Sequence, residues 1–276
     1  MLGTYVEVSL RAALSDFELI SLSNRMFQRI SDIQTQMSFH DSQSKLSQIN
    51  SQPVNIAINL SKDYIELFSI ISDLNAVSQG YFDPSIAPCL VQANILPSTV
   101  YNNIQMHEVS VDEFGCWQDL TLEKNQLIKH KPVMVDLGGI AKGYAVDKAV
   151  ELVPDDVEAC VNAGGDLRCT DWQNQTVGVM HAPAGGESHD VVTPSPVNMF
   201  APAIATTGAY YLDGVSNIVN PKDGTLHNDL RTYSVFAPSC VLADGLTKLA
   251  CLMCDTNNDK LNDLLANYGA TLIVMD

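Results

Sequence analysis

The stretch "VDLGGIAKGYAVDKA", residues 135–149, decides how this sequence is interpreted. It predicts a strand that ends at Asp136, a turn through glycines 138 and 139, and a helix directly after them. Glycine has no side chain, so the main chain of such a turn can approach a ligand closely. The first N–H groups of a helix lack partners within the helix, and Lys142 lies in the first turn. The stretch therefore indicates a site for an anion such as a phosphate or diphosphate.

The same stretch leaves open the type of ligand and the role of Asp136. It forms neither a P-loop nor a GxGxxG fingerprint, so the type of nucleotide does not follow from it. Asp136 would accept a hydrogen bond from a base or a sugar, or help to place a cation. A tight turn between a strand and a helix, with a surface lysine, explains the pattern equally well.

The overall charge limits the classes of partner. The chain has 276 residues, with 15 Lys and Arg against 32 Asp and Glu, and its formal net charge of −17 is spread along the sequence. A field of that sign repels nucleic acids and anionic membrane surfaces, so we expect no nucleic-acid partner. Any ligand that carries phosphate must therefore find a local positive group.

Length and hydropathy are typical of a soluble protein. The length suits one large domain or two small ones. No apolar run reaches 18 residues, and Met1 leads into a strand pattern without the charged start of a signal peptide. We expect a soluble chain and not an integral membrane protein, although a mature chain would look the same after an export signal had been removed.

The order of the predicted elements favours an α+β fold. Residues 3–10 alternate as a half-buried strand, and helical spacing follows from Asp16 and again from a Ser61 cap to a stop at Gly80. The further expected elements are a hairpin about Asn125, a loop at 182–198, strands at 133–138, 159–166, 175–180, 203–207, 215–219, 231–237 and 271–275, and helices at 140–153, 243–254 and 258–267. Strands and helices mix without βαβ regularity, which argues against a doubly wound sheet.

Cysteine and histidine usage indicates no disulfide framework and no histidine metal site. The seven cysteines are an odd number at irregular spacing. Cys251 and Cys254 form a CxxC within the apolar run "LTKLACLMC", which favours buried thiols on a core helix over a redox or metal role. The six histidines show no HxH or HExxH spacing.

Three loops and one helix start carry candidate chemistry. "VNAGGD" at 161–166 and "IATTGAYY" at 204–211 are glycine-containing strand ends that are, taken alone, more often plain turns. "GYFDPSIAPC" at 80–89 sets aromatic residues beside Asp83, either to hold a flat ring or to cap the loop. "CVLADGLTKLACL" places Asp244 at a predicted helix start, where a carboxylate commonly caps N–H groups and otherwise holds a hard cation.

Taken in this order, these stretches resemble the ApbE family of FAD:protein FMN transferases over nearly the whole chain. The segments that carry the resemblance, besides the opening stretch, are "LGTYVEV", "MSFHDSQSKLSQIN", "SQGYFDPSIAPCL", "NAGGDLRC", "IATTGAYY", "NIVNPKDG" and "SVFAPSCVLADGLTKLACLM". The resemblance implies one domain over residues 1–276 with a T-fold-like α+β architecture, in which helices flank mixed antiparallel sheets. It also implies a periplasmic or membrane-associated location.

The activity implied by the resemblance is a flavin transfer. Such a protein binds FAD as substrate together with Mg²⁺, cuts the diphosphate, and moves FMN onto a Ser or Thr hydroxyl of a partner flavoprotein, releasing AMP. Contacts with the flavin nucleotide are implied for His40, Tyr81, Phe82, Asp83, Asp136, Lys142, Val219 and Thr247. The metal is assigned to the backbone oxygen of Gly139 and to the carboxylate of Asp244. No catalytic residue is assigned.

The sequence departs from the family pattern at two places. The usual "HIIDPRTG" reads "NIVNPKDG", so Asn217 and Asn220 replace a His and an Asp, and neither amide can act as a base. The Thr expected four residues after the metal-binding Asp244 is Lys248, whose ammonium would repel Mg²⁺.

These departures lead to a hypothesis about the metal. Asp244 and Lys248 are one helical turn apart and can pair, so Lys248 would take over the charge role of Mg²⁺ and the site would turn FAD over slowly or not at all. The alternatives to an impaired transferase are a non-catalytic protein that binds or delivers FAD, and a structural paralogue without a ligand.

Overall fold

The computed structural model describes residues 1–98, 113–179, 194–208, 217–229, 231–255 and 258–275. The chain folds as two compact units. Unit 1 comprises Met1–Gln34, Ile140–Ser216 and Asn228–Asp276, and unit 2 comprises Thr35–Gly139 and Asn217–His227. The expected single domain over residues 1–276 stays a prediction.

The centre of unit 1 is a six-stranded antiparallel sheet in the order β1-β5-β6-β9-β10-β11. The strands are β1 Val6–Arg11, β5 Glu158–Ala163, β6 Asp166–Cys169, β9 Ala203–Gly208, β10 Thr232–Ala237 and β11 Thr271–Met275. The predicted N-terminal strand is confirmed, and its exposure alternates along the chain as a period of two requires. Every residue of β10 is buried, which fits a strand in the interior of the sheet.

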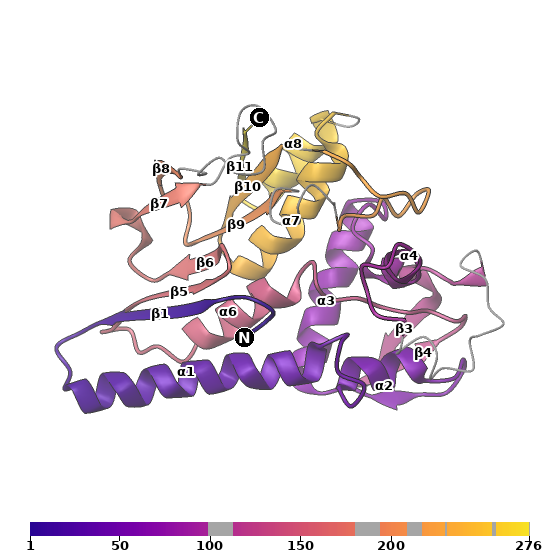
Figure 1. Ribbon diagram of the computed structural model, residues 1–276, viewed down its shortest axis with the longest axis horizontal. Helices are drawn as coiled ribbons and strands as arrows, with labels where there is room; N and C mark the ends of the chain where they lie inside the picture. The colour runs from indigo at the N-terminus through magenta and orange to yellow at the C-terminus, as the bar shows by residue number, and fades with distance from the viewer. Residues whose placement is uncertain (99–112, 180–193, 209–216, 230, 256–257, 276) are drawn as a thin grey trace. The chain divides into compact units, whose positions relative to one another are not determined.

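Two helices cover one face of this sheet (Figure 1). The α-helices described in unit 1 are α6 Ala141–Val150, α7 Cys240–Met253, α8 Asn258–Asn267 and most of α1 Asp16–Met37, and a short 3-10 helix, η4, spans Trp172–Asn174. α6 and α7 pack against each other, with α7 on β9 and β10 and α6 on β5 and β6. Small side chains allow this approach, because Ala205 and Ala237 of the sheet cluster with Ala243 of α7. None of the helices in the described ranges combines the length and apolar composition needed to cross a bilayer.

The opposite face of the sheet carries a second apolar layer. Ile204 and Phe236 alternate with the alanines that face α7, so their side chains point away from the helices. They cluster with Val179, Met199 and Cys169. The antiparallel ribbon of β7 Thr176–Val179 and β8 Ser195–Asn198 contributes to this layer. The loop predicted at 182–198 thus contains a strand at its end, β8. Residues 182–193 of that prediction fall outside the described ranges.

Gly143 brings α6 within backbone contact of α7. A Cβ built at this position would lie 2.3 Å from the carbonyl oxygen of Cys240 and 2.9 Å from the Cβ of Asp244. We expect Gly143→Ala to lower the free energy of unfolding by about 1–3 kcal/mol, because backbone atoms cannot yield without shifting a helix. Urea denaturation measures this loss. An unchanged or raised stability, the usual result of replacing glycine by alanine in a helix, would contradict the contact.

Unit 2 combines short helices with a three-stranded sheet in the order β2-β4-β3. Its elements are α2 Lys45–Ser51, β2 Ile58–Asn59, α3 Lys62–Val77, η1 Pro84–Ile86, α4 Ala87–Gln92, η3 Trp117–Asp119, β3 Leu120–Glu123 and β4 Gln126–Lys129. The predicted helix after Ser61 is confirmed as α3. The predicted hairpin is also confirmed, and Lys124 and Asn125 adopt positive φ angles of 47° and 67° in its two-residue turn.

The strand predicted at 133–138 is wrong, and a single side chain explains why. Asn50 accepts a hydrogen bond from the Val135 N–H at 2.8 Å and donates one to the Val135 carbonyl at 2.9 Å. The Asp136 N–H donates to the carbonyl of Pro84 at 2.8 Å. The amide of Asn50 thus satisfies the backbone that a neighbouring strand would otherwise pair, and the segment remains irregular.

Three other predicted elements differ in the structure. The element at 159–166 is the β5–β6 hairpin, which turns at Gly164 and Gly165 with φ angles of 66° and 102°. α7 begins at Cys240 and not at 243, so Asp244 lies in its second turn. The part of the 215–219 prediction within the described residues is an isolated bridge between Val219 and Leu226 rather than a strand.

The cysteines include one pair that sequence spacing did not reveal. Cys160 and Cys169 are directly opposed on β5 and β6, and the structure joins them in a disulfide. Cys251 is buried, as predicted for the CxxC, and burial raises its pKa to about 12. Cys254 is half-buried, and burial raises its pKa as well. Both thiols therefore favour the packing role over a redox role.

A buried lysine in unit 2 should make stability depend on pH. Lys129 is 3% exposed, and its ammonium donates to the carbonyls of Asn50 at 2.9 Å and Val133 at 3.2 Å. Burial lowers the pKa of Lys129 from 10.5 to about 8. Between these values the folded state has lost the proton that the unfolded state still binds, so stability rises with pH. Below pH 8 Lys129 is protonated in both the folded and the unfolded state, so the folded state bears the full free-energy cost of burying the ammonium.

Lys129→Met tests this dependence. Between roughly pH 8 and pH 10.5, we expect the free energy of unfolding of the wild-type protein to rise by about 1–3 kcal/mol relative to that of Lys129→Met. One unit of pKa corresponds to about 1.4 kcal/mol. Chemical denaturation across this range measures the difference. Lys124→Met, at an exposed position of the same hairpin, is the control. Parallel pH profiles for wild type and Lys129→Met would refute the assignment.

Candidate functional site

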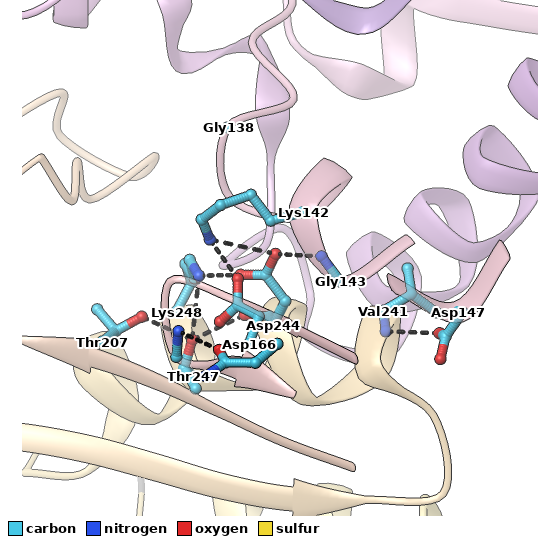
Figure 2. A network of polar contacts seen from close by, with 12 residues as sticks. Gly138, Lys142, Gly143, Asp147, Asp166, Thr207, Val241, Asp244, Thr247 and Lys248 are labelled. Carbon is cyan, nitrogen blue, oxygen red and sulfur yellow. Dashed lines mark hydrogen bonds and ion pairs between the residues drawn. The ribbon is translucent and has the colours of Figure 1, made fainter. Parts of the chain in front are cut away.

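Four charged side chains meet where α6 and α7 pack together in unit 1 (Figure 2). Lys142 comes from the first turn of α6, Asp166 from the start of β6, and Asp244 and Lys248 from successive turns of α7. We call these four residues the ion cluster. Its carboxylate side chains are 3% and 0% exposed, whereas those of Lys142 and Lys248 are 29% and 16% exposed.

Asp244 lies at the centre of the ion cluster. Its Oδ1 contacts the ammonium of Lys248, and its Oδ2 accepts the Gly143 N–H at 3.1 Å and lies 3.7 Å from Lys142 Nζ. The prediction that Asp244 and Lys248 pair across one helical turn is confirmed. The prediction that Asp244 caps its own helix is wrong, since the backbone N–H that it binds belongs to α6.

The two carboxylates differ in their electrostatic surroundings. Burial acts to raise the pKa of Asp244, but Lys142 and Lys248 outweigh it and hold that pKa below its ordinary value. Burial and repulsion by Asp244 raise the pKa of Asp166, although Lys142 contacts it directly. Burial would lower the pKa of Lys142, but both carboxylates together raise it. The charges of Asp244 and Lys142 therefore stabilise each other.

A chain of hydroxyl groups extends the ion cluster toward the sheet. Thr207 of β9 and Thr247 of α7 lie 2.8 Å apart through their Oγ1 atoms. The Thr247 hydroxyl donates to the carbonyl of Asp244 at 2.7 Å, and the ammonium of Lys248 donates to it at 3.2 Å. Thr247 is fully buried and its hydroxyl has protein partners, so its expected contact with FAD stays a prediction.

A further buried carboxylate fixes the start of α7. Asp147 on α6 accepts the backbone N–H groups of Cys240 at 2.9 Å and Val241 at 2.8 Å. It also pairs with Arg168 of β6 at 2.7 Å. Burial raises the pKa of Asp147 despite these partners. This residue supplies the cap that the sequence assigned to Asp244, and it positions the helix that carries Asp244 and Lys248.

Asp147, Asp166 and Arg168 were not predicted as site residues. All three lie in stretches that carry the family resemblance, "AVDKA" at 145–149 and "NAGGDLRC" at 162–169. Their spacing gave no signal, because their partners are 21 to 94 residues away along the chain. Asp147 lies among apolar residues of the predicted helix at 140–153, and a carboxylate in such a position needs a partner.

In unit 2 the predicted flavin loop is held by its own side chains. Asp83 Oδ1 accepts the N–H of Ser85 at 2.8 Å and its hydroxyl at 2.6 Å, and Oδ2 accepts the Trp117 N–H at 3.2 Å. The Phe82 carbonyl accepts from the side chain of Asn75 at 2.8 Å. Phe82 and Asp83 are buried, whereas the half-buried Tyr81 has the ammonium of Lys222 5.2 Å from its ring centroid.

The remaining predicted residues of unit 2 fall into two places. Asp136 accepts the Gly138 N–H at 3.1 Å, just before Gly139. Burial raises the pKa of Asp136, and the nearby His40 acts in the opposite direction. Val219 is buried in its bridge to Leu226. The structure thus brings His40 close to Asp136 in unit 2, and Lys142 close to Asp244 and Thr247 in unit 1.

Asn220, which stands where the resemblance implies an Asp, organises a turn. Its Oδ1 accepts the Lys222 N–H at 3.0 Å, and its Nδ2 donates to Asp223 at 3.2 Å. Its backbone N–H donates to the carbonyl of Thr225 at 2.8 Å. These contacts give Asn220 a structural role, and the bond to Asp223 requires the amide because an ionised carboxylate cannot donate.

The donor set around Asp244 does not fit Mg²⁺. That ion requires an octahedral arrangement of oxygen ligands. Both oxygens of Asp244 face cations or an N–H group. Four residues later, Lys248 supplies an ammonium where the resemblance implies the hydroxyl of a Thr. Within the described part of the chain, no group of three or more His, Cys, Asp and Glu side chains is arranged to hold a metal ion.

Comparison with known proteins identifies relatives along most of the chain. Residues 2–270 match the ApbE family. An FAD:protein FMN transferase of Chlamydia pneumoniae is 27% identical over 88% of this chain and 79% of its own. The protein of the same name from Haemophilus influenzae is 26% identical over 85% of this chain and 74% of its own.

Solved structures share the fold. The ApbE protein of Thermotoga maritima superposes with a TM-score of 0.82 at 21% identity, over 99% of this chain and 91% of its own. The flavin transferase ApbE of Vibrio cholerae gives 0.76 at 23% identity, over 99% and 90%. These likenesses confirm the expected α+β architecture with its antiparallel sheets. On the match over residues 2–270, the chain belongs to the ApbE family.

Proposed function

We propose that this protein is an FAD:protein FMN transferase, which moves FMN from FAD to a Ser or Thr hydroxyl of a partner flavoprotein and releases AMP. The curated relatives with this name support the activity, and they cover most of the chain. One observation on the site carries the proposal: two lysine side chains with access to solvent pair with two buried carboxylates where α6 and α7 pack together. This arrangement gives an acidic chain the local positive group that a diphosphate needs.

The reaction is an in-line displacement at phosphorus. The hydroxyl oxygen of the acceptor forms a bond to the phosphorus of the FMN half, and the bond from that phosphorus to the bridging oxygen breaks. AMP leaves with the bridging oxygen, and the acceptor hydroxyl loses its proton. Negative charge grows on the leaving phosphate, where the ammonium groups of Lys142 and Lys248 would stabilise it.

The residues of this chain divide into those that would touch FAD and those that position them. Lys142 and Lys248 would contact the diphosphate, and Asp244 orients both of them through its two oxygens. Asp147 positions the start of α7 through the N–H groups of Cys240 and Val241. The contacts of Tyr81 and Asp136 with a flavin nucleotide, in unit 2, stay predictions.

The position expected to hold the base for the acceptor hydroxyl carries a residue that cannot accept its proton. Asn217 stands where the family pattern has His, and an amide cannot take the proton of the acceptor hydroxyl. General-base catalysis typically contributes about 10²–10⁴-fold to a rate. We therefore expect slow turnover, and the substitution favours a second candidate function, a protein that binds or delivers FAD without cleaving it.

An assay for AMP and for covalent flavin tests both candidates. The purified protein is incubated with FAD and a lysate of the source cells, with and without Mg²⁺. Transferase activity predicts AMP by chromatography and a fluorescent flavin band that survives denaturing electrophoresis. If FAD binds yet stays intact in both conditions, the transferase proposal is wrong and the binding or delivery role replaces it.

A further inference from the structure

We propose that Lys142 and Lys248 receive the diphosphate of FAD directly, so that this chain binds FAD without a divalent metal. The inference rests on the proposed function, because it names the cations that act at the same site. Its basis is the disagreement between the ligands that Mg²⁺ requires and the groups that surround Asp244.

The carboxylate of Asp244 is already neutralised by protein groups. Oδ1 contacts the ammonium of Lys248, while Oδ2 accepts the Gly143 N–H at 3.1 Å and faces Lys142 Nζ at 3.7 Å. The side chain is 0% exposed, so solvent does not compete for these contacts. For Asp244 to ligate Mg²⁺, the ammonium of Lys248 would have to leave, or else two cations would share one carboxylate.

Access to the ion cluster favours an anion over a cation. The side chains of Lys142 and Lys248 keep 29% and 16% of their exposure, while the two carboxylates keep 3% and 0%. The carboxylates are therefore less accessible than the lysine side chains. An anion that approaches from solvent would reach the lysine side chains first, and their positive charge would oppose a metal ion.

The position of Lys248 is fixed by more than its ion pair. Its ammonium also donates to the hydroxyl of Thr247 at 3.2 Å, and that hydroxyl is held by Thr207 at 2.8 Å and by the carbonyl of Asp244 at 2.7 Å. A lysine anchored in this way loses less conformational entropy on binding an anion than a free surface lysine does. The contacts therefore preorganise the ammonium as a binding group.

The charge balance predicts what happens when Lys248 is lost. The ion cluster pairs two carboxylates with two ammonium groups and is formally neutral. Lys248→Thr would leave one uncompensated carboxylate next to a new hydroxyl, which is a donor set that attracts Mg²⁺. The substitution should therefore convert binding that ignores metal into binding that requires it.

Equilibrium binding of FAD to metal-free protein tests the inference. Flavin fluorescence is measured in EDTA and in Mg²⁺ for wild type, Lys248→Thr and Lys248→Arg. We expect the wild-type dissociation constant to agree within about twofold between the two conditions, which is well under 1 kcal/mol. Lys248→Thr should bind about tenfold to a hundredfold more weakly in EDTA and recover in Mg²⁺. Lys248→Arg should retain binding in EDTA.

Two controls keep the result specific. Lys260→Met removes one positive charge from an exposed position of α8, outside the ion cluster, and should leave both dissociation constants unchanged. Circular dichroism verifies that each variant is folded. The inference is overturned if wild type binds FAD only in Mg²⁺, or if folded Lys248→Thr binds in EDTA as tightly as wild type does.

The inference and the proposed function can fail separately. FAD binding in EDTA without any AMP would uphold the metal-free site and refute the transferase. AMP and labelled acceptor that appear only with Mg²⁺, together with metal-dependent binding, would uphold the transferase and refute the metal-free site.

Discussion

Asp244→Asn is expected to lower the free energy of unfolding by about 3–5 kcal/mol, the usual cost of removing one partner from a buried ion pair. The variant keeps the size of the side chain but leaves Lys142 and Lys248 without a carboxylate between them. The amide nitrogen would also face either an ammonium or the Gly143 N–H, and it can accept from neither. Urea denaturation with a fluorescence readout measures the loss.

A double variant separates charge from packing in this prediction. Asp244→Asn combined with Lys248→Met removes the unpaired ammonium together with the carboxylate, and should recover part of the stability. Asp263→Asn, an exposed position of α8, is the matched control and should change stability by less than about 0.5 kcal/mol. If Asp244→Asn is no more destabilising than Asp263→Asn, Asp244 does not hold α6 and α7 together.

Features that depend on neighbouring residues could be predicted from the sequence. The turn at Lys124 and Asn125 followed from an asparagine between two alternating runs, since asparagine tolerates a positive φ. The pair of Asp244 and Lys248 followed from a spacing of one helical turn. Both features depend on residues a few positions apart, and their geometry is set by a single element of secondary structure.

Features that depend on distant residues could not be predicted. The segment around Val135 looked like a strand because its side chains are apolar, yet its backbone pairs with Asn50, 85 residues earlier. Asp244 looked like a cap because it precedes an apolar helical run, yet Asp147 caps that helix from 93 positions away. In both cases a polar side chain on another element satisfies backbone groups that local rules assign to neighbours.

Lys142→Met is expected to lower the rate of AMP release from bound FAD by about 10²–10³-fold, the typical cost of losing one donor that stabilises charge in the transition state. Lys142 is the member of the ion cluster with the largest exposure, and it belongs to the first turn of α6. Its loss should appear in kcat at saturating FAD, because the leaving phosphate gains charge only as the bond breaks.

The structural role of Lys142 must be separated from its role toward FAD. Lys142→Met leaves Asp166 buried beside Asp244 without its partner, which also costs stability. Combining it with Asp166→Asn removes that unpaired charge, so stability should recover while AMP release stays slow. Lys148→Met, which loses a lysine paired with Glu151 further along α6, should keep the wild-type rate. A double variant that regains both stability and rate would show that Lys142 acts only on the fold, and the diphosphate would then need another cation.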